Sequence, residues 1–191
     1  DLCTEFGFRR LGERIAALTT PPVELVWEAD YRTVGDLAQL TSIAVELSER
    51  PQFAIGTETT HTNPRWASLV GITLSWQAQI AYYIPLRAPA SDVCLEWVEV
   101  AKILGPVLSN PKIEKIGQNL KSDVIVFKTH GIQVQGACFD TMVADYLLSP
   151  GERNHDTDDL SRRYLHHATV KAKDLTGTGR QQRGMHEVPV E

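Results

Sequence analysis

The sequence predicts a mixed-sheet α/β fold in a single main domain, and three observations support this. Apolar alternation on both sides of a short turn at Gln77-Ala78 indicates an early β-hairpin. Helical and strand-like patterns then alternate along the rest of the chain, which favours a sheet flanked by helices. The 191 residues, 42% of them hydrophobic and 23% charged, suffice for one soluble domain with its own core and a short appendage.

The N-terminal part is predicted to lie outside that domain. Residues 2–18 have a helical apolar pattern, and Thr19-Thr20-Pro21-Pro22 ends it as a linker. This segment has the character of the end of an upstream region. A short strand at Tyr31–Val34 and a helix at Asp36–Glu49 follow.

The middle of the chain contains the predicted hairpin. Three strands are expected at Gln52–Glu58, Ser68–Trp76 and Gln79–Pro85, the last two being antiparallel. A helix over Val93–Leu108 follows, with a kink near Gly105-Pro106.

The next elements alternate. A strand is predicted at Lys112–Gly117, a helix at Asn119–His130 ended by Gly131, and a short strand at Gln135–Phe139.

Two more helices are expected, and then no further clear element after Ala168. One opens at Asp140-Thr141 and another at Asp156 or Thr157. The side chains of the first that we expect to pack inward are Met142, Val143, Tyr146 and Leu147.

Composition narrows the class of protein. The formal net charge of -5 argues against a protein that coats nucleic acid through bulk charge, although residues 152–183 hold seven Lys or Arg against five Asp or Glu. No apolar run reaches the roughly 18 residues of a membrane span, and no signal peptide is recognisable. Cys3, Cys94 and Cys138 are odd in number and form no CxxC pair, which indicates reduced thiols and a cytoplasmic protein rather than a disulfide framework or a zinc site.

Three short stretches carry the chemistry. They are Thr57-Glu58-Thr59 at a strand end, residues 117–123 at a strand-to-helix junction, and Phe139-Asp140-Thr141 at another such junction. Singly, each has an ordinary explanation: Glu58 and Asp123 as solvated charges, and Asp140 as a helix N-cap.

Together and in this order, these stretches resemble the 3′-5′ proofreading exonuclease domain of bacterial family A DNA polymerase I, a DEDD exonuclease with the ribonuclease H-like fold. The resemblance extends from about Tyr31 to the last residue. It predicts a linker from an upstream 5′-nuclease region at 1–33 and an exonuclease domain, incomplete at its C-terminus, at 34–191. The motifs that carry it are Thr57-Glu58-Thr59, Leu69-Val70-Gly71, Tyr83-Ile84-Pro85, Gly117-Gln118-Asn119-Leu120-Lys121, Phe139-Asp140-Thr141-Met142, and Asp159-Leu160 through Tyr164-Leu165.

The resemblance implies a metal-dependent hydrolase. In that family four carboxylates hold two Mg²⁺ or Mn²⁺ ions at the single-stranded 3′ end of DNA, because both the attacking and the leaving oxygen need charge neutralisation. It assigns Glu58 and Asp123 as catalytic metal ligands. It also implies the polymerase and 5′-nuclease domains of the same polypeptide as partners. The residues expected along the bound strand are Thr57, Gln118, Asn119 and Ser122.

Departures from the family pattern lead us to expect little or no hydrolytic activity. The first ligand, an Asp in the family, is Gly56 here, and a Ser stands at 122 where the family usually has an aromatic residue. The family's last motif, Tyr-x3-Asp, would follow just after Glu191. Asp140 and Asp145 are not expected to substitute. His155, His166 and His167 match no zinc spacing and are expected on a polar surface.

Two other functions remain open. A non-catalytic strand-holding or structural module of the polymerase is favoured by Gly56 and Ser122. An exoribonuclease of the ribonuclease D type would share the fold and the metal logic. One base change separates an Asp codon from a Gly codon, so a single mutation or a sequencing error would also account for Gly56.

Overall fold

The computed structural model describes residues 5–8, 15, 28–90, 92–179 and 182–190. The helix predicted over residues 2–18 and the Thr19–Pro22 linker fall largely outside the described residues. Within the described part, no helix is both long enough and apolar enough to cross a membrane.

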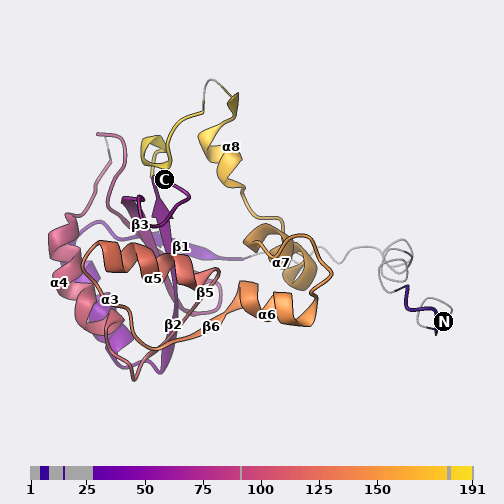
Figure 1. Cartoon of the computed structure of the whole chain (residues 1–191). Coiled ribbons are helices and arrows are strands. Elements are labelled where there is room, and N and C mark those ends of the chain that lie inside the picture. The colour runs from indigo at the N-terminus through magenta and orange to yellow at the C-terminus, as the bar shows by residue number, and fades with distance from the viewer. Residues whose placement is uncertain (1–4, 9–14, 16–27, 91, 180–181, 191) are drawn as a thin grey trace.

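A six-stranded mixed sheet forms the centre of the domain, in the order β1-β4-β3-β2-β5-β6 (Figure 1). β2 pairs antiparallel with β3 and parallel with β5, so it lies in the middle of the sheet. The strands are β1 (Asp30–Thr33), β2 (Gln52–Thr59), β3 (Leu69–Gln77), β4 (Ile80–Pro85), β5 (Glu114–Gly117) and β6 (Ala137–Asp140).

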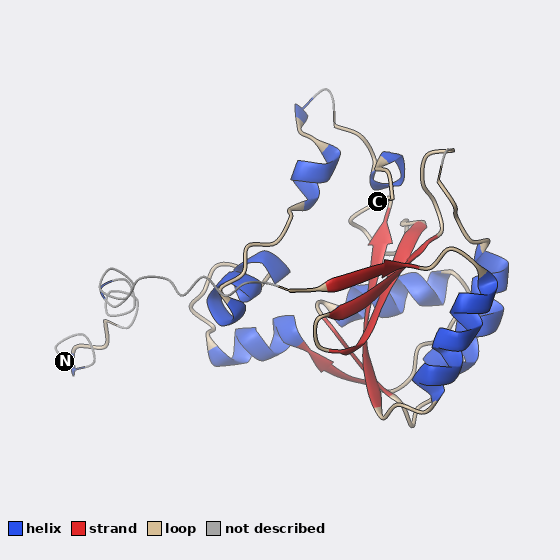
Figure 2. Cartoon of the chain, turned by 180° about the vertical axis from the view of Figure 1, so that it is seen from behind, coloured by secondary structure: helices blue, strands red, loops and turns tan. Residues whose placement is uncertain are grey.

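Helices connect and flank these strands. Figure 2 shows α3 and α4 side by side on one side of the sheet, while α6 and α7 lie beyond the β6 end. The helical elements are α3 (Leu37–Ser48), α4 (Trp97–Leu108), α5 (Leu120–Thr129), α6 (Thr141–Leu148), α7 (Thr157–Leu165), α8 (Ala172–Thr176) and the 3-10 helix η2 (Met185–Glu187).

The core lies between the sheet and the helices α3, α4 and α5. Alternate residues of β2, Phe53 and Ile55, are 1% and 4% exposed, and Ile72 of β3 is fully buried. The next alternate position of β2 on that face is Thr57, whose partner across the sheet is Ile72. Gly56 and Glu58 therefore face the opposite side, away from the main core.

Helix boundaries are largely those predicted, because their caps are local. The Asp36 side chain accepts a hydrogen bond from the Gln39 amide and begins α3. The Asp156 side chain does the same for α7, through the Asp159 amide. α4 begins at Trp97 rather than Val93, since the Leu95 amide donates to the Pro85 carbonyl and keeps the preceding segment extended along β4.

The prediction for the inward face of α6 was wrong. Val143, Tyr146 and Leu147 are 51%, 55% and 73% exposed, whereas Asp145 is only 3% exposed. α6 turns its Asp145 face toward α7, which meets that carboxylate with hydrogen-bond donors. Met142 is half-buried.

The chain after Ala168 contains more regular structure than predicted. α8 and η2 are short, and they return the chain to the sheet near the end of β2, as Figure 1 shows in yellow. The Val190 amide donates to Asp92 Oδ2 at 2.7 Å, which fixes this return. The last residues of the predicted linker, Asp30–Thr33, pair in parallel with β4.

Candidate active site

The site forms where β5 stops short of its neighbour β2. β5 pairs with β2 only as far as Ala54↔Ile116, so the β2 edge from Gly56 onward has no neighbouring strand on that side. The chain turns at Gly117 into α5, and the first turns of that helix lie beside this unpaired edge of β2. A cleft of about 590 Å³ opens there, and its walls include Gly56, Glu58 and Asp123.

Asp123 reaches β2 through this gap. Its Oδ1 accepts hydrogen bonds from the Thr57 amide at 3.0 Å and from Thr57 Oγ1 at 2.6 Å. The Asp123 carboxylate thus accepts the hydrogen bond of the Thr57 amide, which would have gone to β5 if that strand were longer. Among the described residues no donor reaches Oδ2, so this is the oxygen available to a ligand.

Burial raises the pKa of Asp123 to about 6. The two hydrogen bonds from Thr57 oppose this shift, and the negative charges of Asp140 and Glu58 add to it. The pKa of Glu58 is raised as well, again through the groups packed around its carboxylate, although the residue as a whole is exposed. The two predicted ligands are therefore close enough to repel each other.

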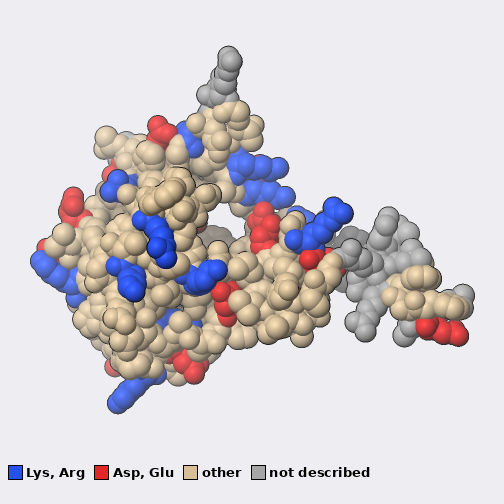
Figure 3. Space-filling model, viewed as in Figure 1, with Lys and Arg blue, Asp and Glu red and all other residues tan. Residues whose placement is uncertain are grey.

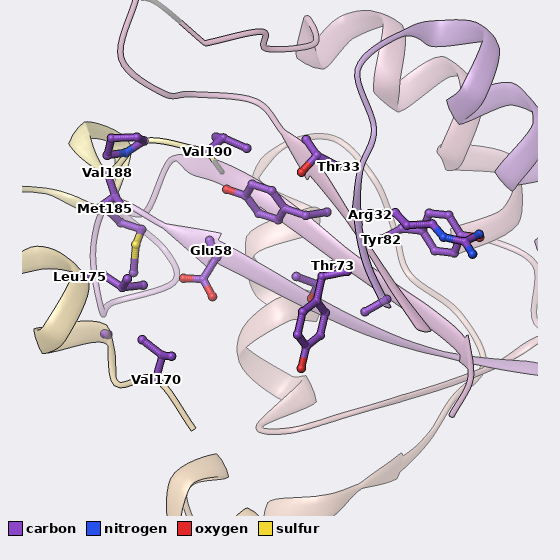
Figure 4. A pocket seen from close by; sticks show the side chains of 15 residues that line it. Arg32, Thr33, Glu58, Thr73, Tyr82, Val170, Leu175, Met185, Val188 and Val190 are labelled. Carbon is purple, nitrogen blue, oxygen red and sulfur yellow. The ribbon is translucent and has the colours of Figure 1, made fainter. Parts of the chain in front are cut away.

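Glu58 projects from β2 toward the returning C-terminal segment, with Met185 and Leu175 near it in Figure 4. A second cavity of about 440 Å³ lies on this side and is lined by β1, β4 and residues 170–190. Tyr83 of β4 belongs to it. Burial, and then the charges of Glu58 and Cys94, raise the pKa of Tyr83 to about 12.

Asp140 is a structural residue here, as its N-cap prediction requires. It caps two helices: Oδ1 accepts from the Asn119 and Met142 amides, and Oδ2 accepts from the Leu120 amide. These bonds hold the strand-to-helix junction on which Asp123 depends. With both oxygens so engaged, Asp140 is a poor substitute ligand.

The residues predicted along the bound strand lie at different places. Gln118 lines the cleft, its Nε2 donating to the His155 carbonyl at 2.6 Å and its Oε1 accepting from Thr141 Oγ1. Asn119, in the left-handed conformation with φ of 53°, lines an adjoining cavity of about 600 Å³ with Gln118. Ser122 is half-buried on α5, outside the lining of the cleft. Thr57 holds Asp123, a role that sequence reasoning missed.

The expectation that the histidines lie on a polar surface was wrong for His155. Its Nδ1 lies 2.5 Å from Asp145 Oδ2, and its side chain is only 12% exposed. His166 ends α7 in the left-handed conformation. Cys94 and Cys138 are both unpaired, while Cys3 falls outside the described residues.

The carboxylates present do not fit a pair of metal ions. Across the described ranges, no three His, Cys, Asp or Glu side chains gather so that they could hold one. The cleft offers Glu58 and one free oxygen of Asp123, with a glycine at 56. Two hard cations need more oxygen ligands than this.

The surface around the cleft carries both signs of charge. Figure 3 shows Lys and Arg side chains on either side of the hollow between the sheet and the α7–α8 segment, with acidic side chains between them. Such a surface can hold a nucleic-acid backbone locally without attracting it at long range.

A mixed sheet of this strand order, with helices on its flanks, one acidic side chain at the end of its central strand and a second reaching that strand from α5, defines the ribonuclease H-like exonuclease class. The chain belongs to the 3′-5′ exonuclease family, whose model matches residues 31–188.

Curated relatives are DNA polymerases I. That of Pseudomonas aeruginosa is 32% identical over 168 residues, which cover 86% of this chain and 18% of the polymerase. That of Synechocystis is 35% identical over 161 residues, covering 80% and 16%. The chain therefore spans less than a fifth of the length of these relatives.

Solved structures share the fold. Pol1 from M. smegmatis, in complex with DNA primer-template and dNTP, has a TM-score of 0.59 at 24% identity, over 72% of this chain and 23% of that one. The catalytic core of RRP6 from Trypanosoma brucei has a TM-score of 0.60 at 15% identity, over 80% and 39%. NrnC of Brucella melitensis with bound Mg²⁺ has a TM-score of 0.52 at 17% identity, over 81% and 69%.

Proposed function

We propose that this chain is the 3′-5′ exonuclease domain of a DNA polymerase I that engages the single-stranded 3′ end of DNA but hydrolyses it slowly or not at all. The observation that carries this proposal is the cleft itself. It retains Glu58 and Asp123 on β2 and α5, while the position two residues before Glu58 is a glycine.

The deficit is electrostatic. Hydrolysis of a phosphodiester in this family requires paired cations to neutralise the attacking and leaving oxygens. Two carboxylates, with a glycine at position 56, supply too few oxygen ligands and too little negative charge to hold such a pair. The domain's own residues can still position a strand: Gln118 and Asn119 line adjoining cavities where the strand would pass.

The test is digestion of a 5′-labelled single-stranded DNA oligonucleotide by the purified chain in Mg²⁺ or Mn²⁺. The matched standard is the corresponding domain of the Pseudomonas aeruginosa polymerase. We expect release of nucleoside 5′-monophosphates to be at least a hundredfold slower than in the standard. Digestion within a few-fold of the standard would refute the proposed impairment.

A second candidate is a strand-holding module with no hydrolytic role, which the glycine at 56 favours. It predicts that the affinity for a 3′-ended single strand is the same in EDTA as in Mg²⁺. A Gln118→Ala variant should weaken that affinity several-fold, with the uncharged Val45→Ala on the exposed side of α3 as a control. Loss of all binding in EDTA would exclude this module.

The ribonuclease D-type reading rests on fold alone. T. brucei RNase D has a TM-score of 0.60 at 14% identity. Hydrolysis of RNA and DNA oligonucleotides of the same sequence, compared in the same assay, distinguishes a ribonuclease D-type exoribonuclease from a DNA polymerase I exonuclease domain. We expect no preference for RNA.

A further inference from the structure

The space at position 56 is already occupied by another side chain. A Cβ atom built on Gly56 would lie 2.7 Å from Thr73 Oγ1, closer than real Cβ atoms come to a neighbour. Gly56 and Thr73 are direct partners in the β2–β3 ladder. The Thr73 hydroxyl thus stands where any larger residue at 56 would begin.

The backbone of Thr73 cannot withdraw from this contact. It lies in β3, held between β2 on one side and β4 on the other, where its partner is Tyr83. The Tyr83 ring is folded over Gly71, so that a Cβ on Gly71 would lie 2.2 Å from the phenol oxygen. Gly56, Thr73 and Tyr83 are neighbours across β2, β3 and β4, and the packing of the Tyr83 ring on Gly71 holds β3 against β4.

Only a change of the Thr73 side-chain rotamer can make room. A β-branched residue in a strand has a restricted χ1, and turning it exchanges the hydroxyl for the methyl group or for hydrogen. An alanine at position 73 would have neither the hydroxyl nor the methyl group of threonine, so it would leave room for a Cβ atom at position 56. The neighbour of position 56 is therefore adapted to glycine.

We propose that Thr73 influences which residue the first ligand position can hold, so that a carboxylate at 56 is accommodated at lower cost when the Thr73 side chain is shortened. This inference rests on the proposed function for its catalytic meaning, since it takes position 56 as a ligand position.

The test is a double-mutant cycle in the full chain. Its members are Gly56→Ala, Gly56→Asp, Thr73→Ala and the two combinations with Thr73→Ala, each measured in EDTA by thermal unfolding. We expect Gly56→Ala and Gly56→Asp to lower Tm by several degrees when Thr73 is present, and by less than half as much when they are combined with Thr73→Ala. Gly35→Ala is the control, because a Cβ there meets nothing within 4 Å, and it should not couple to Thr73→Ala.

Mn²⁺ binding by calorimetry supplies a second readout, which a purely structural role for Thr73 would not move. We expect the Gly56→Asp/Thr73→Ala variant to bind Mn²⁺ at least tenfold more tightly than Gly56→Asp alone. Equal Tm losses with and without Thr73→Ala would overturn the role of Thr73. Coupled Tm losses without any gain in Mn²⁺ affinity would support the steric role of Thr73 and count against the proposed metal-ligand position, which separates the two failures.

Discussion

Two buried aspartates in this domain show how differently one side chain behaves in two surroundings. Asp123 and Asp145 are 6% and 3% exposed. Asp123 receives both its hydrogen bonds from one neutral residue, Thr57. Asp145 is met by His155, Arg163 and Tyr164, at 2.5, 2.6 and 2.7 Å.

Relative to the ordinary pKa of an aspartate side chain, the pKa of Asp123 is raised and the pKa of Asp145 is lowered. Burial raises the pKa in both cases. At Asp145 the hydrogen bonds from His155, Tyr164 and Arg163, with the charge of Arg163, outweigh burial and lower the pKa to about 2. At Asp123 the neighbouring charges are those of other acids, and the pKa rises to about 6.

The difference separates a structural carboxylate from one that we propose to be functional. Asp145 has its counter-charge inside the protein, and it ties α6 to α7. Asp123 is left with an uncompensated charge at the wall of a cleft, a state that costs stability and that a bound cation would relieve.

The largest expected effect is the loss of the Asp145 cluster. Asp145→Asn leaves the Arg163 guanidinium without its anion and is expected to cost about 3 kcal/mol of unfolding free energy. Urea denaturation measures this. Asp159→Asn, which removes the exposed Asp159–Arg162 pair instead, is the control and should change stability by less than about 0.5 kcal/mol.

The same substitution at Asp123 should act in the opposite direction. Asp123→Asn keeps an oxygen for both Thr57 donors and removes a charge that burial disfavours, so at pH 8 we expect a stabilisation of about 2 kcal/mol. Glu58→Gln, at a carboxylate with solvent contact, should shift stability in the same direction by less. A destabilised Asp123→Asn protein would mean that this charge is compensated.

The two carboxylates also predict different pH windows. The folded pKa of Asp123 lies above its unfolded value, so its cost is absent below about pH 4 and grows as the pH rises to 6. The folded pKa of Asp145 lies below its unfolded value. Its contribution is therefore present above about pH 4 and is lost as the pH falls toward 2.

Urea midpoints from pH 2 to pH 8 test this. We expect the difference in urea midpoint between Asp123→Asn and the unmodified chain to change between pH 4 and 6. The corresponding difference for Asp145→Asn should change below pH 4. Curves that stay parallel at all pH values would contradict both assignments.

The smallest expected effect concerns the neutral donors. Thr57→Val removes one of the two bonds to Asp123 and should cost about 1 kcal/mol. Tyr164→Phe removes one of the three bonds to Asp145 and should cost less, because the Tyr164 side chain is half exposed to water. In an NMR titration, Thr57→Val should also raise the pKa of Asp123 further above 6. An unchanged Asp123 pKa would show that the hydroxyl bond does not form in solution.

Local chemistry explains which parts of the fold were predictable. The N-caps Asp36 and Asp156 act within three residues of themselves along the chain, as does the bond from the Met142 amide to Asp140. The hairpin turn, which lies at Ala78-Gln79, one residue later than predicted, is equally local. The C-terminal elements α8 and η2 escaped prediction because they are short and carry little apolar periodicity.

For the site, the sequence predicted which residues take part but not how their side chains contact one another. The motifs around Glu58 and Asp123 indicated which acids belong together. They gave no sign that Thr57 holds Asp123 or that Thr73 fills the space over Gly56, since both contacts cross between strands or between a strand and a helix. The strand register that creates them is not visible in one sequence.

By itself, then, the sequence determined the order of strands and helices as far as α7 and the helix caps, because these follow from neighbours along the chain, while the two acids were assigned by its resemblance to a known family. Tertiary structure alone decided that α6 buries Asp145 rather than its apolar side chains, that β5 ends early enough for Asp123 to reach β2, and that Thr73 stands over Gly56. Each of these depends on which groups meet across space, and the free energy of a buried charge or a close contact is set by those groups.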